Sequence, residues 1–420
     1  MKLNLKSWSP SPTDSAIIIF LSLLSVLVGW LGWRLIPWLQ IALEDGNVDD
    51  INKLLLAVAG VIGVYFLVWR TWIADRQRHV AQEELYTSLL TKAVEQLGAT
   101  REEKSYRQPP VGLEDDTILT AADVTFPLPR AGSVTKTAPN LEVRLGAIYA
   151  LEKLARDYLP LHWQIMEILC AYVRTNAGPP KARPEQIDTI ITRDGNSWTL
   201  SEREAWRKHW SGLKPFVDIQ AALTVIGRRS EKQKKYEEKL TQSQNHQARV
   251  LDLSNCHLAR IDLRGMYFRR ANIDGSCLEA AYLEGADLRE ASFREAQLNS
   301  AHFFEALLDG AVLTEAQLSG ASLQHASLER AYAVSAKIES TNLVGTNLKG
   351  ARLDGASFVG SNLESANMEE TFIERTDFTG VKSLNQEQLN GAFGDAYTIL
   401  PDKLTRPARW LESYEGDIPD

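Results

Sequence analysis

The sequence predicts three structural parts: a two-helix transmembrane hairpin, a small α-helical domain of HEAT-like character, and a parallel β-helix. Three observations predict them. Two long apolar runs lie within residues 1–73, and apolar residues recur at helical spacing within residues 74–230. An apolar residue, large everywhere except at Ala333, occupies every fifth position of residues 253–378. We therefore expect an anchor, a helical linker and a rod built from repeats, in that order along the chain.

The hairpin is predicted from two spans at about residues 16–35 and 51–72. The runs AIIIFLSLLSVLVGWLGW and LLLAVAGVIGVYFLVW carry no charge, and each approaches the ~20 residues that cross a bilayer. Two alternatives are a cleaved signal peptide, although the first run lacks a small-x-small cleavage site, and a pair of core helices in a soluble protein. Tryptophans gather at the ends of the spans, as in an interfacial aromatic belt: Trp30, Trp33, Trp38, Trp69 and Trp72.

The charges beside the spans predict their orientation. Lys2 and Lys6 precede the first span and three arginines follow the second, whereas acidic residues dominate the connection between them. Basic flanks stay in the cytoplasm. We therefore expect a multi-pass protein of the plasma (inner) membrane, with two spans and both termini in the cytoplasm.

Residues 74–98 are predicted to continue the second span as a helical stalk, which ends at Gly98. Residues 99–140 combine charge clusters with several prolines and show no sustained period. We interpret them as an insertion that is partly disordered.

An α-helical domain is predicted over residues 141–230. Its three amphipathic segments are LEVRLGAIYALEKLARD, HWQIMEILCAYVRT and DIQAALTVIGRR, with Pro160 between the first two. A second insertion, residues 177–217, mixes three tryptophans with basic residues. Such a mixture is compatible with binding to nucleic acid or to an anionic bilayer surface, but a helix that buries its tryptophans against the domain is the favoured interpretation.

Residues 231–250 are predicted to form a charged helical connector, and residues 251–380 the β-helix. The 26 consecutive apolar hits at period five cannot line one face of a helix, which turns 100° per residue. They cannot line one face of a flat strand either, because an odd period alternates between the faces. The chain must instead turn a corner once per repeat, with the large residue and the small residue two positions before it pointing inward. Glycine recurs at the last repeat position, where a corner can need a positive φ.

Segments such as AYLEGADLREASF and TNLVGTNLKGARLDGASF resemble the pentapeptide-repeat proteins, whose consensus is close to A(D/N)LXX. The resemblance implies a right-handed quadrilateral parallel β-helix, a pentapeptide-repeat solenoid with four repeats per coil, in which residues 20 positions apart stack. The three helical segments also resemble the linker domain of bacterial membrane-tethered pentapeptide-repeat proteins. The two insertions are longer than that group leads us to expect.

Both ends of the solenoid are predicted to be capped. Inward positions that hold small residues elsewhere are large at the N-terminal end, namely Leu251, Cys256, Ile261 and Met266, and atypical terminal repeats are expected as caps. Residues 381–420 are predicted to form a C-terminal cap and tail. Ser383 and Gln386 match a capping box, and the segment YTILPDKLTRPARW resembles the closing segment of the same family.

Composition and motifs argue against catalytic or metal chemistry. Residues 251–380 hold 19 acidic and 11 basic residues and therefore carry the whole net charge of −8. The three cysteines lack metal-ligand spacing, the seven histidines are scattered, and no Walker loop or nucleophile elbow is present. We expect no enzyme activity, no catalytic residue, no cofactor and no metal.

The predicted function is that of a non-enzymatic, membrane-anchored scaffold that presents its β-helix to the cytoplasm for protein–protein interaction. Its expected partners are the membrane lipid bilayer and a protein, which can be a second copy and so give a homo-oligomer. Nucleic acid is not an expected partner. Two alternatives are a DNA-mimic binder of a topoisomerase, because the rod is acidic, and an oligomeric membrane effector whose hairpins line a pore. The candidate interaction patch consists of outward apolar residues: Phe304, Leu307, Val312, Tyr332 and Val334.

Overall fold

The structure is a computed structural model of the 420-residue chain. It describes individual helical residues between positions 19 and 41, and then residues 48–106, 133–178, 217–243 and 249–412. The chain has two compact units, Met1–Leu89 and Leu90–Asp420.

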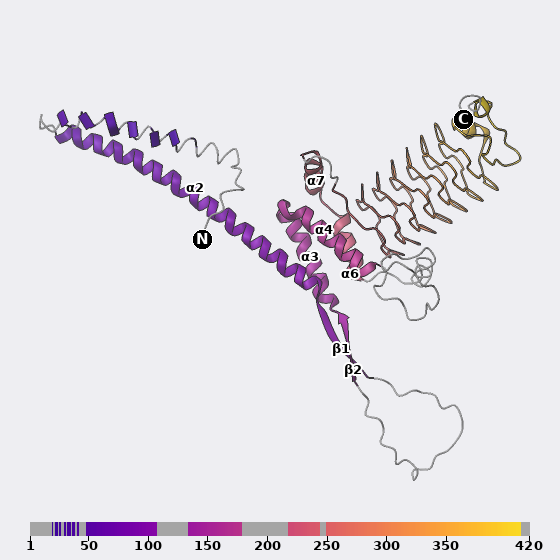
Figure 1. Cartoon of the computed structure of the whole chain (residues 1–420), viewed down its shortest axis with the longest axis horizontal. Helices are drawn as coiled ribbons and strands as arrows, with labels where there is room; N and C mark the ends of the chain where they lie inside the picture. Colours follow the sequence, from indigo (N-terminus) through magenta and orange to yellow (C-terminus); the bar gives the residue numbers. More distant parts are fainter. Residues whose placement is uncertain are drawn as a thin grey trace, which may run out of the picture. The chain divides into compact units, whose positions relative to one another are not determined.

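The first unit contains most of the long helix α2 (Val48–Leu97, 50 residues; Figure 1). The second predicted span lies within α2, whereas much of the first falls outside the described residues. In the part of the chain that the structure describes, no helix combines the length and the apolarity that a membrane crossing needs. Large apolar side chains are exposed along the described middle of α2: Leu56, Ile62, Val64, Phe66, Leu67 and Trp69.

A β-hairpin follows α2, and the sequence analysis did not anticipate it. Strand β1 (Thr100–Tyr106) pairs antiparallel with β2 (Ser133–Pro139), from Thr100 opposite Pro139 to Tyr106 opposite Ser133. The backbone N–H of Asn140 donates to the Ala99 carbonyl at 3.1 Å and so closes the base of the hairpin. β1 has the sequence TREEKSY, whose charges hide any alternation of apolar and polar residues.

The helical domain consists of α3 (Leu141–Asp157), the short η2 (Leu159–Leu161), α4 (His162–Ala177) and α6 (Val217–Gly227). Helix α7 (Glu231–Ser243) lies in the predicted charged connector. Residues 179–216, the greater part of the second predicted insertion, lie outside the described residues. Fully buried apolar side chains of α3, α4 and α6 form the domain core: Ile148, Leu151, Ile165, Leu169 and Ile219.

The repeat segment folds as a parallel β-helix, as predicted. Each outward residue pairs in parallel with the residue 20 positions later, from Asp252 with Asn272 to Asn362 with Lys382. Four five-residue repeats therefore complete one coil, and the coils stack as Figure 1 shows. The 26 inward residues of this track, 25 large side chains and Ala333, are 2 % exposed or less. Where the small inward residue is Ser or Thr, its hydroxyl donates to a carbonyl of the preceding coil, as Thr341 does to Leu318 at 2.8 Å.

Every repeat turns its corner through a residue with positive φ. The last residue of all 26 repeats has φ between +51° and +71°, yet glycine fills only ten of these positions. A side chain in this left-handed region costs about 1–2 kcal/mol. The glycine pattern in the sequence therefore marks fewer than half of the corners, and the stacked coils stabilise the others.

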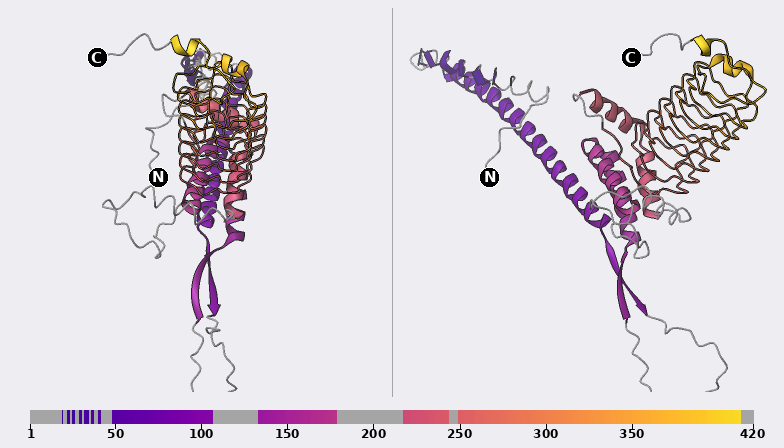
Figure 2. Two further views of the ribbon diagram at one scale, coloured as in Figure 1. Left: turned by 90° about the vertical axis from the view of Figure 1, so that its right-hand side faces the viewer. Right: turned by 45° about the vertical axis from the view of Figure 1, so that its right-hand side comes forward.

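The segment after residue 380 closes the C-terminal end of the rod (Figure 2). Phe393 pairs with Phe372 and Ile399 with Asp377, so this segment adds one irregular coil. Helix α8 (Gln386–Gly391) begins at Asn385, which forms a capping box with Gln388. The predicted cap at Ser383 is wrong, because Ser383 has a φ of +59° whereas Asn385 has the extended backbone of an N-cap.

Candidate functional site

The helical domain covers the first edge of the β-helix. In an interior coil the N–H and C=O of each outward residue bond to the preceding coil; the Asn272 N–H donates to the Leu251 carbonyl, and the Asn272 carbonyl accepts from the Leu253 N–H. The first coil has no preceding coil, so its outward backbone groups need other partners. Those residues are Asp252, His257, Asp262 and Tyr267.

Side chains and helix ends of the helical domain replace the missing coil at all four sides. The Gln220 amide imitates a strand, because it donates to the Asp262 carbonyl at 2.8 Å and accepts from the Asp262 N–H at 3.0 Å. The Tyr267 N–H donates to the Gly227 carbonyl at 3.0 Å, and Arg229 donates to the Tyr267 carbonyl at 3.0 Å.

The remaining two sides are closed from α4. The His257 N–H donates to the Ala177 carbonyl at 2.6 Å, and Arg174 donates to the Asp252 carbonyl at 2.5 Å. Arg174 also pairs with the Asp252 carboxylate at 2.8 Å. The sequence analysis expected a cap here but named none of these residues.

The five residues of the predicted patch do not all lie on one side of the rod. Val312 and Tyr332 form a bridge and lie next to each other, as the 20-residue register predicts. Leu307 occupies the outward position of the preceding repeat, and therefore the preceding side. Phe304 lies in the turn before Leu307, and Val334 lies in the turn after Tyr332. Phe304, Leu307 and Tyr332 are 42 %, 37 % and 47 % exposed.

The side of the rod that carries Tyr332 shows a longer apolar feature, which we call the aromatic column. The Arg352 guanidinium lies 5.7 Å from the centre of the Phe372 ring, and the Phe372 and Phe393 rings lie 5.2 Å apart. Arg409 caps the column at 5.1 Å from the Phe393 ring. Tyr332, Phe372 and Phe393 are each more than a third exposed. The column consists of Val312, Tyr332, Arg352, Phe372 and Phe393.

Arginines interrupt the acidic charge of the rod. The two hydrogen bonds from Arg264, at 2.9 and 2.6 Å, hold the pKa of Asp262 below its usual range. Arg289 pairs with Asp287 in the same way at 2.6 Å, and Glu290 accepts from both Arg269 and Arg270. These pairs leave much of the acidic charge on the first coils neutralised locally.

Two observations on the described residues concern metal binding and thiol chemistry. Among the described residues, no group of three or more His, Cys, Asp or Glu side chains could hold a metal ion. Burial raises the pKa of the Cys170 and Cys256 thiols to about 12, so both thiols are neutral and poor nucleophiles at physiological pH.

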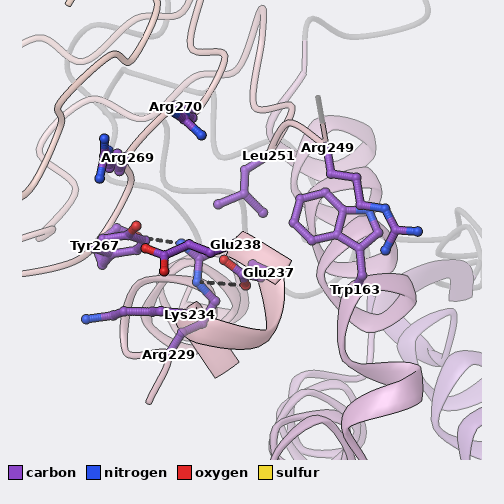
Figure 3. Close-up of a pocket in the computed structure, with 10 residues that line it drawn as sticks. All are labelled: Trp163, Arg229, Lys234, Glu237, Glu238, Arg249, Leu251, Tyr267, Arg269 and Arg270. Atoms are coloured by element: carbon purple, nitrogen blue, oxygen red, sulfur yellow. Dashed lines mark hydrogen bonds and ion pairs between the residues drawn. The ribbon is translucent and has the colours of Figure 1, made fainter. Parts of the chain in front are cut away.

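A pocket of about 350 Å³ lies where α4, α7 and the first coil of the β-helix meet (Figure 3). The sequence analysis missed it, because its lining comes from segments about a hundred residues apart. Cationic and aromatic side chains dominate the lining: Trp163, Arg229, Lys234, Glu237, Glu238, Arg249, Leu251, Tyr267, Arg269 and Arg270.

Comparison with solved structures finds several repeat proteins. HetL, a pentapeptide repeat protein involved in heterocyst differentiation regulation from the cyanobacterium Nostoc sp. strain PCC 7120, is 24 % identical over 35 % of this chain and 67 % of that chain, with a TM-score of 0.25. QnrB1, a plasmid-mediated fluoroquinolone resistance protein, is 19 % identical over 35 % of this chain and 82 % of the QnrB1 chain, with a TM-score of 0.19. A pentapeptide repeat protein from the Arabidopsis thaliana thylakoid lumen is 28 % identical over 34 % of this chain and 74 % of that protein, with a TM-score of 0.17.

Comparison with protein families identifies the repeat itself. No curated protein matches the chain. The family of pentapeptide repeats matches this chain in eight copies. The matched residues are 252–285, 278–310, 296–332, 311–350 and 341–380. These matches cover the coils that the hydrogen-bond register defines, and the β-helix of this chain is therefore built of pentapeptide repeats.

Proposed function

We propose that the protein is a non-enzymatic scaffold whose pentapeptide-repeat β-helix is a binding surface for a protein partner. The aromatic column is the observation that carries this proposal. Aromatic and arginine side chains are the residues that interface centres favour, and here Tyr332, Arg352 and Phe372 lie on adjacent coils of one side.

The rigidity of the rod supports the same function. Backbone hydrogen bonds fix each outward position to the coils before and after it. Tyr332 bonds to Ala311 and Leu313 of the preceding coil, and its chain neighbours Ala331 and Ala333 bond to Arg352 of the following coil. Side chains on such a scaffold lose little backbone freedom on binding, which lowers the entropic cost of association. Arg352 in the column and Arg409 at its end favour a partner that offers carboxylates beside apolar side chains.

Affinity capture from the native cell tests this proposal. We expect the variant Tyr332→Ser with Phe372→Ser to lose the captured partner, because it removes two rings from the centre of the column. The matched control, Asn342→Ser with Asn362→Ser, changes outward residues on the opposite side of the rod, because Asn342 lies two repeats after Tyr332 and Asn362 two repeats before Phe372. Equal capture by both variants would refute the column as the binding surface. Light scattering on the purified chain identifies the case in which the partner is a second copy.

We also propose that the N-terminal segment anchors this scaffold to the plasma (inner) membrane, with the rod in the cytoplasm. The uncharged runs in residues 16–33 and 54–69, their basic flanks and the exposed apolar side chains on α2 support the anchor. We expect the chain to stay in the membrane pellet after alkaline carbonate extraction and a chain without residues 1–73 to leave it. Extraction of the intact chain into the supernatant would contradict the anchor.

A further inference from the structure

The pocket between α4, α7 and the first coil has a positively charged lining, whereas the rod is acidic. Five of its side chains are cationic and two are carboxylates. Figure 3 shows Arg229, Lys234, Glu237 and Glu238 grouped with Tyr267, and Trp163 with Arg249 on the other side of Leu251. Lys234 lies 4.5 Å from the centre of the Tyr267 ring, and the Arg249 guanidinium lies 5.8 Å from the Trp163 ring.

Arg229 is the buried cation of this pocket, and its hydrogen bonding is incomplete. The side chain is 2 % exposed, and Nη2 donates to the Tyr267 carbonyl at 3.0 Å. Within the described structure, Nε and Nη1 have no hydrogen-bond partner. An arginine stays charged in proteins, and a buried charge needs hydrogen-bond acceptors around it. Two buried donors of Arg229 therefore lack a hydrogen-bond acceptor beside the pocket that this side chain lines.

The nearest carboxylate, that of Glu237, does not accept a hydrogen bond from Arg229, because it already accepts one from His162. Oε1 of Glu237 lies 2.6 Å from Nε2 of His162 and 3.5 Å from Nε of Arg229. The Gln233 amide can only donate to Nδ1 of His162, 3.2 Å away, so Nε2 carries the hydrogen that His162 donates to Glu237. Glu237 thus has a short hydrogen bond to His162 and only a longer contact with Arg229.

The other cations differ in how far they are already paired. Lys234 pairs with Glu231 at 2.9 Å, and Arg269 and Arg270 share Glu290 on the next coil. For Arg249 the structure describes the contact with Trp163 but no ion pair among the described residues. The pocket therefore combines the buried guanidinium of Arg229, which lacks part of its hydrogen bonds, with that of Arg249, which is not paired to a carboxylate of the described residues.

We propose that this pocket binds a small phosphate-bearing ligand, with Arg229 supplying the buried donors and Arg249 and Lys234 supplying further positive charge. Phosphate fits this set because its oxygens accept several charge-assisted hydrogen bonds at once, from guanidinium forks and from ammonium groups. The pocket volume of about 350 Å³ is in the range of small-molecule sites. A ligand here contacts α4, α7 and the first coil together, so its binding also stabilises the junction between helical domain and rod.

Isothermal titration of the full-length, detergent-solubilised chain tests the proposal with three probes: inorganic phosphate, pyrophosphate and AMP. A response to all three assigns the site to the phosphate group, and a response to AMP alone assigns it to a nucleotide. We expect Arg249→Glu to weaken binding about tenfold or more, since it reverses a charge in the lining. Arg229→Gln is expected to weaken it as strongly, and near-UV circular dichroism verifies that this buried variant folds.

The control variant Lys337→Glu makes the same type of charge reversal on an outward position of a distant coil, and we expect it to bind like the wild type. Absence of binding by all three probes at about 10 mM, well above a millimolar Kd, would overturn the proposal. So would equal affinity of the wild type and Arg249→Glu. Binding of the cation putrescine in place of the anions would also overturn it, because the two carboxylates of the lining would then define the site.

Discussion

Replacement of Gln220 by methionine tests how the helical domain is joined to the β-helix. Methionine keeps the length and most of the volume of glutamine but can neither donate to the Asp262 carbonyl nor accept from the Asp262 N–H. Both bonds are partly buried, and each such bond contributes about 0.5–1.5 kcal/mol. We therefore expect the first coil at Asp262 to lose about 1–3 kcal/mol of local stability.

Hydrogen exchange measured by mass spectrometry on a peptide that contains Asp262 reports this change. Local opening of the first coil exposes the Asp262 amide, and a loss of 1–3 kcal/mol accelerates its exchange about 5-fold to 150-fold. Peptides from the middle of the rod are expected to exchange as in the wild type, because their amides bond to other coils.

The control is Gln297→Met, which makes the same substitution at an outward position of an interior coil. The Gln297 backbone N–H donates to Ser276 and survives the substitution, and no hydrogen bond of its side chain is described within residues 249–412. We expect no acceleration there. Unchanged exchange at Asp262 in the Gln220 variant, or equal acceleration in both variants, would refute the role of Gln220 as a strand substitute.

Three further predictions concern the C-terminal cap after residue 380, the buried thiols and the acidic rod. Gly394→Ala would place a methyl carbon 2.8 Å from the buried Trp410 ring, so we expect faster proteolysis after residue 380; wild-type resistance would contradict the packing of Trp410. Since burial raises the pKa of Cys170 and Cys256 to about 12 from 9.0, the folded state holds protons that the unfolded state releases. Stability should therefore be constant below about pH 8 and fall above pH 9 by up to about 1.4 kcal/mol per pH unit and thiol; an unchanged urea midpoint between pH 8 and pH 10 would refute this. Because arginines interrupt the acidic rod, we expect the chain to leave gyrase supercoiling unaffected, and inhibition would favour the DNA-mimic alternative.

The β-helix could be predicted from the sequence because its signal is local and repeated. An inward apolar residue every five positions forces one corner per repeat. The resemblance to the pentapeptide-repeat proteins implies four repeats per coil, and the 20-residue register, which the structure confirms, follows from that number. The same register predicts that Tyr332 lies on Val312, and further counting leads to Arg352 and Phe372. It does not lead to Phe393, because the α8 segment shifts the pairing of Phe372 to 21 positions.

The contacts that complete the rod could not be predicted in this way. Gln220 and Asp262 are 42 positions apart, and Arg229 and Tyr267 are 38 positions apart, with no periodic relation between them. A single glutamine on an amphipathic helix looks like any solvent-exposed residue. Its role as a strand substitute depends on where α6 ends against the first coil, and therefore on the packing of the whole domain.

The pocket at the junction escaped prediction for the same reason. Trp163 lies on α4, Arg229 between α6 and α7, and Tyr267 on the first coil. Each of these residues has an ordinary explanation in its own segment. Only the folded junction shows that Arg229 is buried beside other cations, with two donors that make no hydrogen bond to the described residues.

Site-specific photo-crosslinking in living cells tests the central claim most directly. A photoreactive phenylalanine analogue is placed at Tyr332 or at Phe372 on the aromatic column, and at Asn342 on the opposite side as the control. The proposed function predicts the same protein adduct from both column positions and none from the control. Equal adducts from all three positions, or none from the column, would contradict a scaffold that binds its partner through this side of the β-helix.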